Sequence, residues 1–378
     1  MAIELTALET PALLLDEARM HANITRLRDR LPAPGPFLRP HVKTAKCLEV
    51  ALAMSGGVPG PITVSTLREA DRFAQAGFRD IVYAVGISPN KLTHAMALLA
   101  SGVQLSVILD SVEAASALTA FMQGRPERLD VLIEIDTDGH RGGIAPAAPE
   151  LLVVADALRS PSVRLQGVLT HAGESYNCRS TGALEAMAEQ ERAGAVLAAQ
   201  RLRAAGYPAP VVSIGSTPTA LTARDLSGVT EVRAGVFVFF DLVMAGVGVC
   251  TPHDIALSVL TSVIGHQRDK GVTLCDAGWM ALSRDRGTAS QPVDQGYGLV
   301  CDAQGRVLPD FIVTAVNQEH GSIAHRNGDP GRYLDVPVGT MLRILPNHAC
   351  ATGAQHEGYQ VLGQDGTVTA RWPRFGGW

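Results

Sequence analysis

The sequence lacks several features that would each indicate a particular class of protein. Its six cysteines include no Cys-x-x-Cys pair and no regular spacing, which argues against a disulfide framework. No apolar run reaches membrane-spanning length without a charge, a proline or a glycine. Lysine and arginine are scattered, and the net charge of -5 argues against a nucleic-acid surface. The first residues do not resemble a secretion signal, so we expect a cytoplasmic protein.

Apolar runs alternate with amphipathic segments through the N-terminal part of the chain. The runs are rich in Val, Ile and Leu with little alternation, which predicts strands buried on both faces. We expect strands over Phe37–Val42, Ile62–Thr66, Asp80–Val85, Gln104–Asp110, Leu129–Asp136, Leu165–Ala172, Val211–Ser216 and Glu231–Phe237. We expect helices over Thr66–Ala76, Lys91–Leu99, Ser111–Met122, Ala148–Leu158 and Ala183–Ala205. Eight such units, without the Gly-rich fingerprint of open nucleotide-binding sheets, favour a (β/α)8 barrel.

The pattern changes beyond Val249, where runs with β character are separated by turn-rich stretches. Strands are expected over Ile255–Gly265, Val272–Asp276, Phe311–Val316 and Met341–Leu345, and Ala12–Leu15 can join their sheet. We therefore predict a barrel over residues 16–248 and a C-terminal, mainly antiparallel β domain formed by residues 249–378 with residues 1–15.

Chemically useful side chains follow the expected barrel strands, at the rim where barrel enzymes place their active sites. Lys43 follows the first strand, and a partly desolvated lysine can form a Schiff base. Gly215–Thr219 follows the seventh strand, where small and hydroxyl residues at a helix start can hold a phosphate. Taken singly, His41 could be a packed barrel residue and Gly215–Thr219 a simple N-cap turn. Together, the lysine and the phosphate cradle indicate pyridoxal phosphate (PLP).

His348 and Cys350 form a second candidate site, in the predicted β domain. Residues two apart on an extended strand share a face, so this pair could offer one imidazole and one thiolate to a metal such as zinc. Two protein ligands leave coordination positions open, which suits a catalytic metal. The alternative is an ordinary strand with a buried cysteine and a half-buried histidine.

The motifs also resemble a known family when they are taken in order. The resembling segments are Pro40–Thr44, Ile62–Thr66, Glu134–Asp136, His171–Gly173, Gly215–Thr219, Asp276–Gly278, Asn317–Gly321 and Pro346–Cys350. Over nearly the whole chain the sequence is similar to the D-serine dehydratase and D-threonine aldolase family of PLP enzymes. That resemblance implies the alanine-racemase-like fold (fold type III) and a homodimer in which the β domain of one subunit closes the barrel mouth of the other.

Several residue roles follow from the resemblance alone. Lys43 would bind PLP and act as the base at Cα. His348 and Cys350 would bind a divalent metal, usually zinc, with manganese or magnesium as alternatives. Further cofactor and phosphate contacts are implied at Arg141, His171, Tyr176, Gly215, Ser216 and Thr217. Asp276 and Gln318–His320 would lie near the metal or the substrate, with the roles of Asp276 and Glu319 left open.

The metal pair favours one reaction within the family. D-threonine aldolases resemble His-x-Asp at this point and the dehydratases His-x-Cys, so His348 and Cys350 imply dehydration. We expect a D-3-hydroxy amino acid as substrate, foremost D-threo-3-hydroxyaspartate, giving oxaloacetate and ammonia. D-serine, giving pyruvate and ammonia, is the alternative.

Arg284 or Arg286 could bind a second carboxylate of the substrate, and Gln318 and His320 are further candidates for substrate binding. A solvated basic loop is the other explanation for the two arginines.

Other functions fit the sequence less well. Aldol cleavage as in D-threonine aldolase stays an alternative. A non-enzymatic PLP carrier protein with this barrel would lack residues 250–378. A racemase would need a tyrosine acid/base in the β domain, where the candidates are Tyr297, Tyr333 and Tyr359. It would also leave the metal pair unexplained. The expected partner is a small D-amino acid, with no nucleic acid and no membrane.

Overall fold

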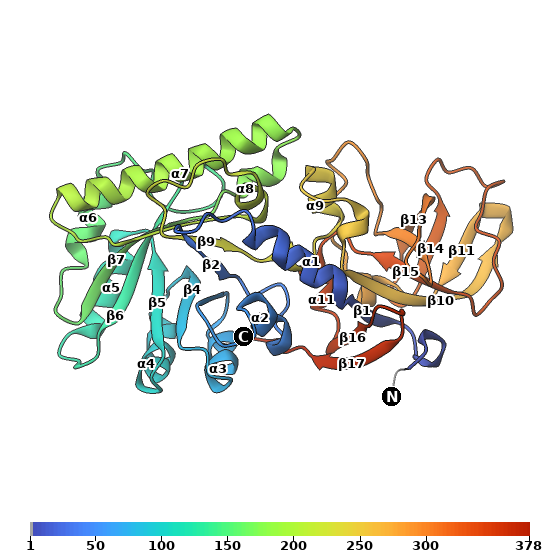
Figure 1. Ribbon diagram of the computed structural model, residues 1–378, viewed down its shortest axis with the longest axis horizontal. Helices are drawn as coiled ribbons and strands as arrows, with labels where there is room; N and C mark the ends of the chain where they lie inside the picture. The colour runs from blue at the N-terminus through green and yellow to red at the C-terminus, as the bar shows by residue number, and fades with distance from the viewer. Residues whose placement is uncertain (1–2) are drawn as a thin grey trace. The chain divides into compact units, whose positions relative to one another are not determined.

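The computed structural model describes residues 3–378, which fold into two compact units (Figure 1). One unit, here the barrel unit, spans Arg26–Gly235 and includes Gly377–Trp378. The other, here the sheet unit, runs up to Thr25 and resumes over Val236–Gly376. None of the helices formed by the described residues has the length and apolarity needed to cross a membrane.

Parallel strands form the sheet of the barrel unit. Their spatial order within residues 3–378 is β2-β9-β8-β7-β6-β5-β4-β3. Their bounds are β2 Phe37–Pro40, β3 Ile62–Val64, β4 Asp80–Gly86, β5 Gln104–Leu109, β6 Leu129–Ile135, β7 Val163–Thr170, β8 Val211–Ile214 and β9 Glu231–Ala234. A bridge between His41 and Thr63, with Val42 N donating to the Thr63 carbonyl at 2.9 Å, joins the two ends of this order. The sheet therefore closes, which confirms the predicted barrel.

Helices follow the barrel strands, and hydroxyl side chains start several of them. The bounds are α1 Glu17–Arg28 (which continues from the sheet unit), α2 Leu48–Met54, α3 Leu67–Gln75, α4 Leu92–Ala100, α5 Val112–Met122, α6 Glu150–Ala157, α7 Thr181–Ala204 and α8 Thr217–Thr222, with 3-10 turns at η2 Pro89–Lys91 and η3 Gly173–Asn177. Thr66, Ser111 and Ser180 each accept a hydrogen bond from the backbone N–H three residues later. Such N-caps satisfy an amide that has no partner inside the helix.

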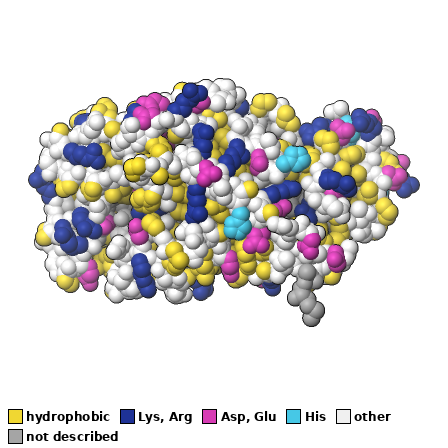
Figure 2. All heavy atoms as spheres, viewed as in Figure 1, with side chains coloured by type: hydrophobic (Ala, Val, Ile, Leu, Met, Phe, Trp, Pro, Cys, Tyr) yellow, Lys and Arg dark blue, Asp and Glu magenta, His cyan; other side chains and the backbone are white. Residues whose placement is uncertain are grey.

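Apolar side chains pack the barrel sheet from strand to strand. Val82, Ile108, Leu132 and Leu169, from β4 to β7, form one buried cluster. Each such burial stabilises the fold by about 1.5–3 kcal/mol before entropy is counted. On the face drawn in Figure 2, Lys and Arg side chains lie among Asp and Glu rather than in one continuous basic area.

The sheet unit contains a mainly antiparallel sheet. Its order among the described residues is β11-β14-β13-β12-β15-β10-β1-β16-β17. The strands are β1 Ala12–Asp16, β10 Leu257–Gln267, β11 Val272–Cys275, β12 Leu299–Asp302, β13 Val307–Val316, β14 Gly321–His325, β15 Met341–Leu345, β16 Gly358–Leu362 and β17 Val368–Pro373. The short helices are α9 Leu242–Val247, α10 Trp279–Leu282 and α11 Ala349–Gly353, with 3-10 turns at η1 Leu5–Ala7, η4 Val236–Val238, η5 Pro252–Asp254 and η6 Arg268–Lys270. The helices beyond Val249 in the described chain, α10 and α11, are short.

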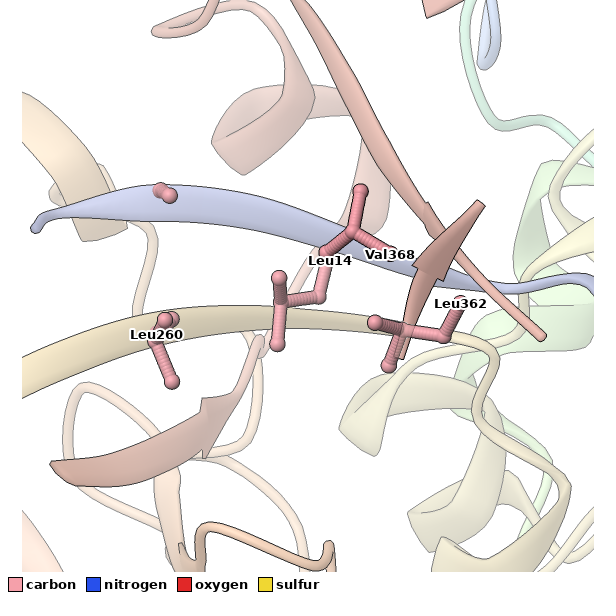
Figure 3. Packing of buried hydrophobic residues seen from close by; sticks show 5 residues of the cluster. Leu14, Leu260, Leu362 and Val368 are labelled. Carbon is pink, nitrogen blue, oxygen red and sulfur yellow. The ribbon is translucent and has the colours of Figure 1, made fainter. Parts of the chain in front are cut away.

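The N-terminal strand is part of the core of this sheet. β1 pairs antiparallel with β10, placing Ala12 opposite Leu260, and parallel with β16. Figure 3 shows Leu14 of β1 packed with Leu260, Leu362 and Val368 from β10, β16 and β17. The fold thus confirms the predicted C-terminal antiparallel sheet, whereas the expected boundaries at residues 15 and 248 stay a prediction of domain organisation.

Candidate functional site

Lys43 lies in a tight loop directly after β2, and its side chain is exposed. The loop is closed by Lys46 N, which donates to the Val42 carbonyl at 2.8 Å. The Lys46 ammonium in turn lies 2.9 Å from a carboxylate oxygen of the buried Glu69. The other oxygen of Glu69 accepts from Ser65 N after β3. A buried ion pair therefore fixes the backbone that presents Lys43.

Two histidines with lowered pKa values face Lys43. Burial and then the Lys43 cation lower the pKa of His171 to about 3, and the same two causes lower the pKa of His41 well below its ordinary value. Both rings are therefore neutral at physiological pH. His171 Nδ1 lies 2.9 Å from the Gly215 carbonyl, which can only accept, so Nδ1 carries the proton and Nε2 is left as an acceptor.

The turn from β8 into α8 forms the predicted cradle. Gly215 has φ +141, and a Cβ there would lie 1.9 Å from the Arg233 carbonyl, so only glycine fits. Ser216 caps α8 reciprocally with Thr219, and its hydroxyl also meets Ser175 Oγ at 2.9 Å. Hydroxyls and helix-start amides are the groups that bind phosphate in proteins. The residues present therefore fit the phosphate of PLP.

Arg141 and Tyr176 are the other two side chains predicted to contact PLP. Tyr176 lies in η3, with its ring centroid 6.4 Å from that of His171. Arg141 is 61% exposed and reaches Glu134 at 3.6 Å. Its charge acts on His171 and lowers the pKa of that residue. Lys43, Arg141, His171, Tyr176, Gly215 and Ser216 are thus gathered in one part of the barrel unit, with Thr217 as the first residue of α8.

Two charged residues of this region were missed by the sequence analysis. Arg233 on β9 is 3% exposed and donates to Ser213 Oγ and to the Thr170 carbonyl, both at 2.5 Å. Burial lowers the pKa of Arg233 to about 10, so the guanidinium stays charged at neutral pH. The sequence did contain a signal for Arg233, because a charged residue is unusual inside a run that is expected to form a buried strand.

The second missed residue is Glu191, a fully buried carboxylate on α7. One of its oxygens accepts from Ala172 N at 3.0 Å and from Gly215 N at 2.9 Å. The other accepts from Thr219 Oγ1 at 2.7 Å. One side chain therefore ties the ends of β7 and β8 to α8. Because it stands in the middle of a long amphipathic helix, no motif pointed to it.

The predicted strand through His348 and Cys350 is wrong. β15 ends at Leu345, and Pro346, which has no N–H, precedes a turn into α11. His348 is the extended N-cap residue of α11, and Cys350 lies in its first turn. The expected pairing of the two side chains is nevertheless present, because a hydrogen bond joins the imidazole to Cys350. The start of a short helix brings them together instead of a strand face.

The surroundings of His348 are acidic. Its Nδ1 lies 2.8 Å from Asp285 Oδ2. Burial lowers the pKa of His348, but Asp285 and Cys350 raise it, giving a value of about 11. Asp241 is fully buried and accepts from Ala349 N at 2.9 Å, which fixes the start of α11. Within residues 3–378 no group of three or more His, Cys, Asp and Glu side chains is arranged for a metal, so His348 and Cys350 would act as a pair. An imidazole and a thiolate are a donor set that fits zinc.

The two arginines predicted to bind substrate differ in whether their guanidinium groups are already paired with a carboxylate. Arg286 is held by Asp294 at 2.6 Å and lies over the Tyr297 ring. Arg284 is exposed and stacks on Trp279, with 4.4 Å from its guanidinium carbon to the ring centroid. It makes no ion pair with the described residues.

Gln318, Glu319 and His320 belong to the exposed turn between β13 and β14. The Gln318 carbonyl accepts from Met280 N in α10. Among the described residues, the hydrogen bonds and the ion pair of the His348 imidazole are to Asp285 and Cys350 and not to these three side chains. Asp276 accepts from Thr10 Oγ1, Thr261 Oγ1 and Ser262 N. These hydrogen bonds tie Asp276 to the segment before β1 and to β10.

Comparisons with known proteins agree with this arrangement. Residues 15–243 match the alanine racemase N-terminal domain family, and residues 256–362 match the putative serine dehydratase domain family. The chain is 56% identical to D-threo-3-hydroxyaspartate dehydratase of Delftia sp. (strain HT23) over 99% of both chains. It is 29% identical to D-serine dehydratase of Dictyostelium discoideum, covering 97% of this chain and 96% of the relative.

A solved structure of a D-threo-3-hydroxyaspartate dehydratase mutant, described as the metal-free form, superimposes with a TM-score of 0.96 at 55% identity. The match covers 99% of this chain and 100% of that one. The predicted resemblance is confirmed: the chain belongs to the alanine-racemase-like family that includes the D-threo-3-hydroxyaspartate and D-serine dehydratases.

Proposed function

We propose that this protein is a PLP- and metal-dependent ammonia-lyase that dehydrates D-3-hydroxy amino acids. Its principal substrate would be D-threo-3-hydroxyaspartate, converted to oxaloacetate and ammonia. The observation that carries the proposal is the 56% identity, over nearly the full length of both chains, to a dehydratase of that substrate. The side chains gathered around Lys43 and His348 support it independently.

The barrel unit would hold PLP through Lys43 and through the turn at Gly215–Thr217. When bound, PLP supplies an electron sink for the charge left at Cα. Lys43 Nζ would take the Cα proton, since a lysine amine is the basic side chain at this rim. Neutral His171 would offer Nε2 as a hydrogen-bond acceptor, and Arg233 a buried positive charge. We assign Arg141 and Tyr176 to the edge of the same pocket.

His348 and Cys350 would hold the divalent metal. A metal there supplies Lewis acidity for loss of the β-hydroxyl. Zinc is the proposed ion, because imidazole and thiolate ligands suit it, whereas magnesium and manganese prefer oxygen ligands. A related dehydratase with a structure described as metal-free supports a metal role in the family.

Arg284 is our candidate for binding the second carboxylate of 3-hydroxyaspartate. Asp294 already neutralises Arg286 at 2.6 Å, while the guanidinium of Arg284 is exposed on the face of Trp279. Arg284 also precedes Asp285, which contacts His348. Gln318 and His320 stay secondary candidates. We further propose a cytoplasmic homodimer.

D-serine dehydration is the second candidate activity, favoured by the 29% identical D-serine dehydratase. One assay separates the alternatives. Purified protein with PLP is incubated with D-threo-3-hydroxyaspartate, D-serine and D-threonine, before and after chelation. We expect 2-oxo acid and ammonia, fastest from 3-hydroxyaspartate, and loss of activity on chelation that zinc restores. Glycine and aldehyde without ammonia would reject dehydration, and full activity after thorough chelation would reject the metal role.

A further inference from the structure

Asp285 makes the most direct contact with the proposed metal pair. Its Oδ2 lies 2.8 Å from Nδ1 of His348, and a carboxylate can only accept, so Nδ1–H is the donor. The side chains of Asp285 and His348 are 30% and 43% exposed, so the contact is partly shielded from water. The bond fixes the ring and leaves Nε2 as the nitrogen available to a metal.

The loop around Asp285 is built to hold this carboxylate still. Asp285 Oδ1 accepts from Gly287 N at 2.7 Å, and Asp285 N donates to Ser283 Oγ at 3.2 Å. Ser283 is buried and has φ +73, a left-handed backbone that a side chain adopts only under constraint. The Asp285 carbonyl accepts from Asn347 Nδ2 at 3.1 Å, and Asn347 directly precedes His348. The loop around Asp285 and the turn that carries His348 are therefore joined by two hydrogen bonds, one to Asn347 and one to His348.

Asp241 also lies near His348 but cannot take the same role. Its two oxygens are committed to the backbone amides of Met244 and Ala349, at 2.9 Å each. Asp285 is thus the carboxylate that is free to orient the imidazole. In metal sites, a carboxylate on the second nitrogen of a ligating histidine fixes its tautomer and increases its basicity.

We propose that Asp285 is the positioning residue of the metal site, which holds His348 so that Nε2 ligates the ion. The inference rests on the proposed metal role of His348 and Cys350. Removing Asp285 would free the ring to rotate and would remove the partner that makes the nitrogen a stronger ligand. Loss of such a partner lowers metal affinity by about 10–100-fold.

The test measures zinc affinity directly, by competition with a chromophoric chelator on the PLP-loaded protein. Asp285→Ala should weaken zinc binding by about 10–100-fold. Asp285→Asn retains an oxygen acceptor without the charge and should fall between wild type and Asp285→Ala. The control is Asp71→Asn, because Asp71 forms a 2.8 Å contact with His94 at similar exposure in the barrel unit. Asp71→Asn should bind zinc like wild type.

A cobalt-substituted protein gives a second readout. The thiolate-to-cobalt absorption of Cys350 should persist in both Asp285 variants, while the visible ligand-field bands change shape as the histidine loses its fixed orientation. Visible absorption of lysine-bound PLP checks that each variant is folded. We expect a loss of about 10–100-fold in zinc affinity. If both Asp285 variants instead bind zinc within about twofold of wild type, the inference about Asp285 is overturned while the proposed metal role stands. If the wild-type chain binds no zinc, the proposed metal role fails and the inference with it.

Discussion

Replacing Glu191 tests whether a single buried carboxylate holds the phosphate cradle. In Glu191→Ala the backbone amides of Ala172 and Gly215 lose their acceptor, and Thr219 Oγ1 loses one partner. Each unsatisfied buried amide costs about 1–3 kcal/mol, so the two amides together cost roughly 2–6 kcal/mol. A loss of about 3 kcal/mol lowers Tm by roughly 6–12 °C in a unit of this size.

Glu191→Gln separates the hydrogen bonds from the charge. Its amide oxygen can accept from both backbone N–H groups, and its nitrogen can donate to Thr219 Oγ1. Burial raises the pKa of Glu191, which means that the charged form is disfavoured in the fold. A neutral amide of the same shape should therefore lower Tm far less than alanine does.

Both variants should be measured by thermal unfolding of the apoprotein and by PLP titration followed through visible absorption. We expect Glu191→Ala to lose stability and PLP affinity together, because Gly215 and Ser216 belong to the cradle it holds. A Tm within about 2 °C of wild type for Glu191→Ala would refute the reasoning, since less than about 1 kcal/mol would then depend on the three bonds.

Two further predictions follow from the site. Arg284→Ala should raise KM for D-threo-3-hydroxyaspartate much more than KM for D-serine, whereas Arg286→Ala should change the two KM values similarly. Steady-state kinetics with both substrates checks this. Equal effects of Arg284→Ala on the two KM values would contradict it. The pKa of His171 falls from 6.5 to about 3 on folding, so the unfolded chain binds the extra proton, and apoprotein stability should decline as pH falls from about 6.5 toward 3. His171→Asn, which can keep the bond to Gly215, should flatten that decline in urea unfolding at several pH values, and an unchanged slope would contradict it.

The barrel strands were predictable because a strand that is buried on both faces appears in the sequence as a continuous apolar run. β5 and β6, for example, lie within the apolar runs expected at Gln104–Asp110 and Leu129–Asp136. Strands of the other sheet are harder to find, since one side of them meets solvent. β14 and β17 show mixed burial and gave no continuous apolar run.

The metal pair shows a different limit of sequence reasoning. Residue types two apart predicted that His348 and Cys350 act together, but the strand assumed for them does not exist. Pro346 and the bond from Ala349 N to Asp241 end the extended backbone there. Asp285 could not be linked to His348 beforehand, because 63 residues separate them and only the folded loop brings them together.

Charge explains why the barrel unit suits an anionic cofactor. Burial, and after it the charges of Lys43 and Arg233, lower the pKa of His41 and of His171, so the two histidines remain neutral rather than adding positive charge. Glu191 accepts hydrogen bonds from Ala172 N at 3.0 Å and from Gly215 N at 2.9 Å, and burial raises its pKa, which disfavours the charged form that would oppose a phosphate. A phosphate at Gly215 would therefore lie beside His171, which is neutral and which feels the positive charges of Lys43 and Arg233. Because Lys43, Arg233 and the Gly215 carbonyl all act on His171, the turn at Gly215 and Lys43 belong to one region of the barrel unit, which favours one bound group over two independent sites.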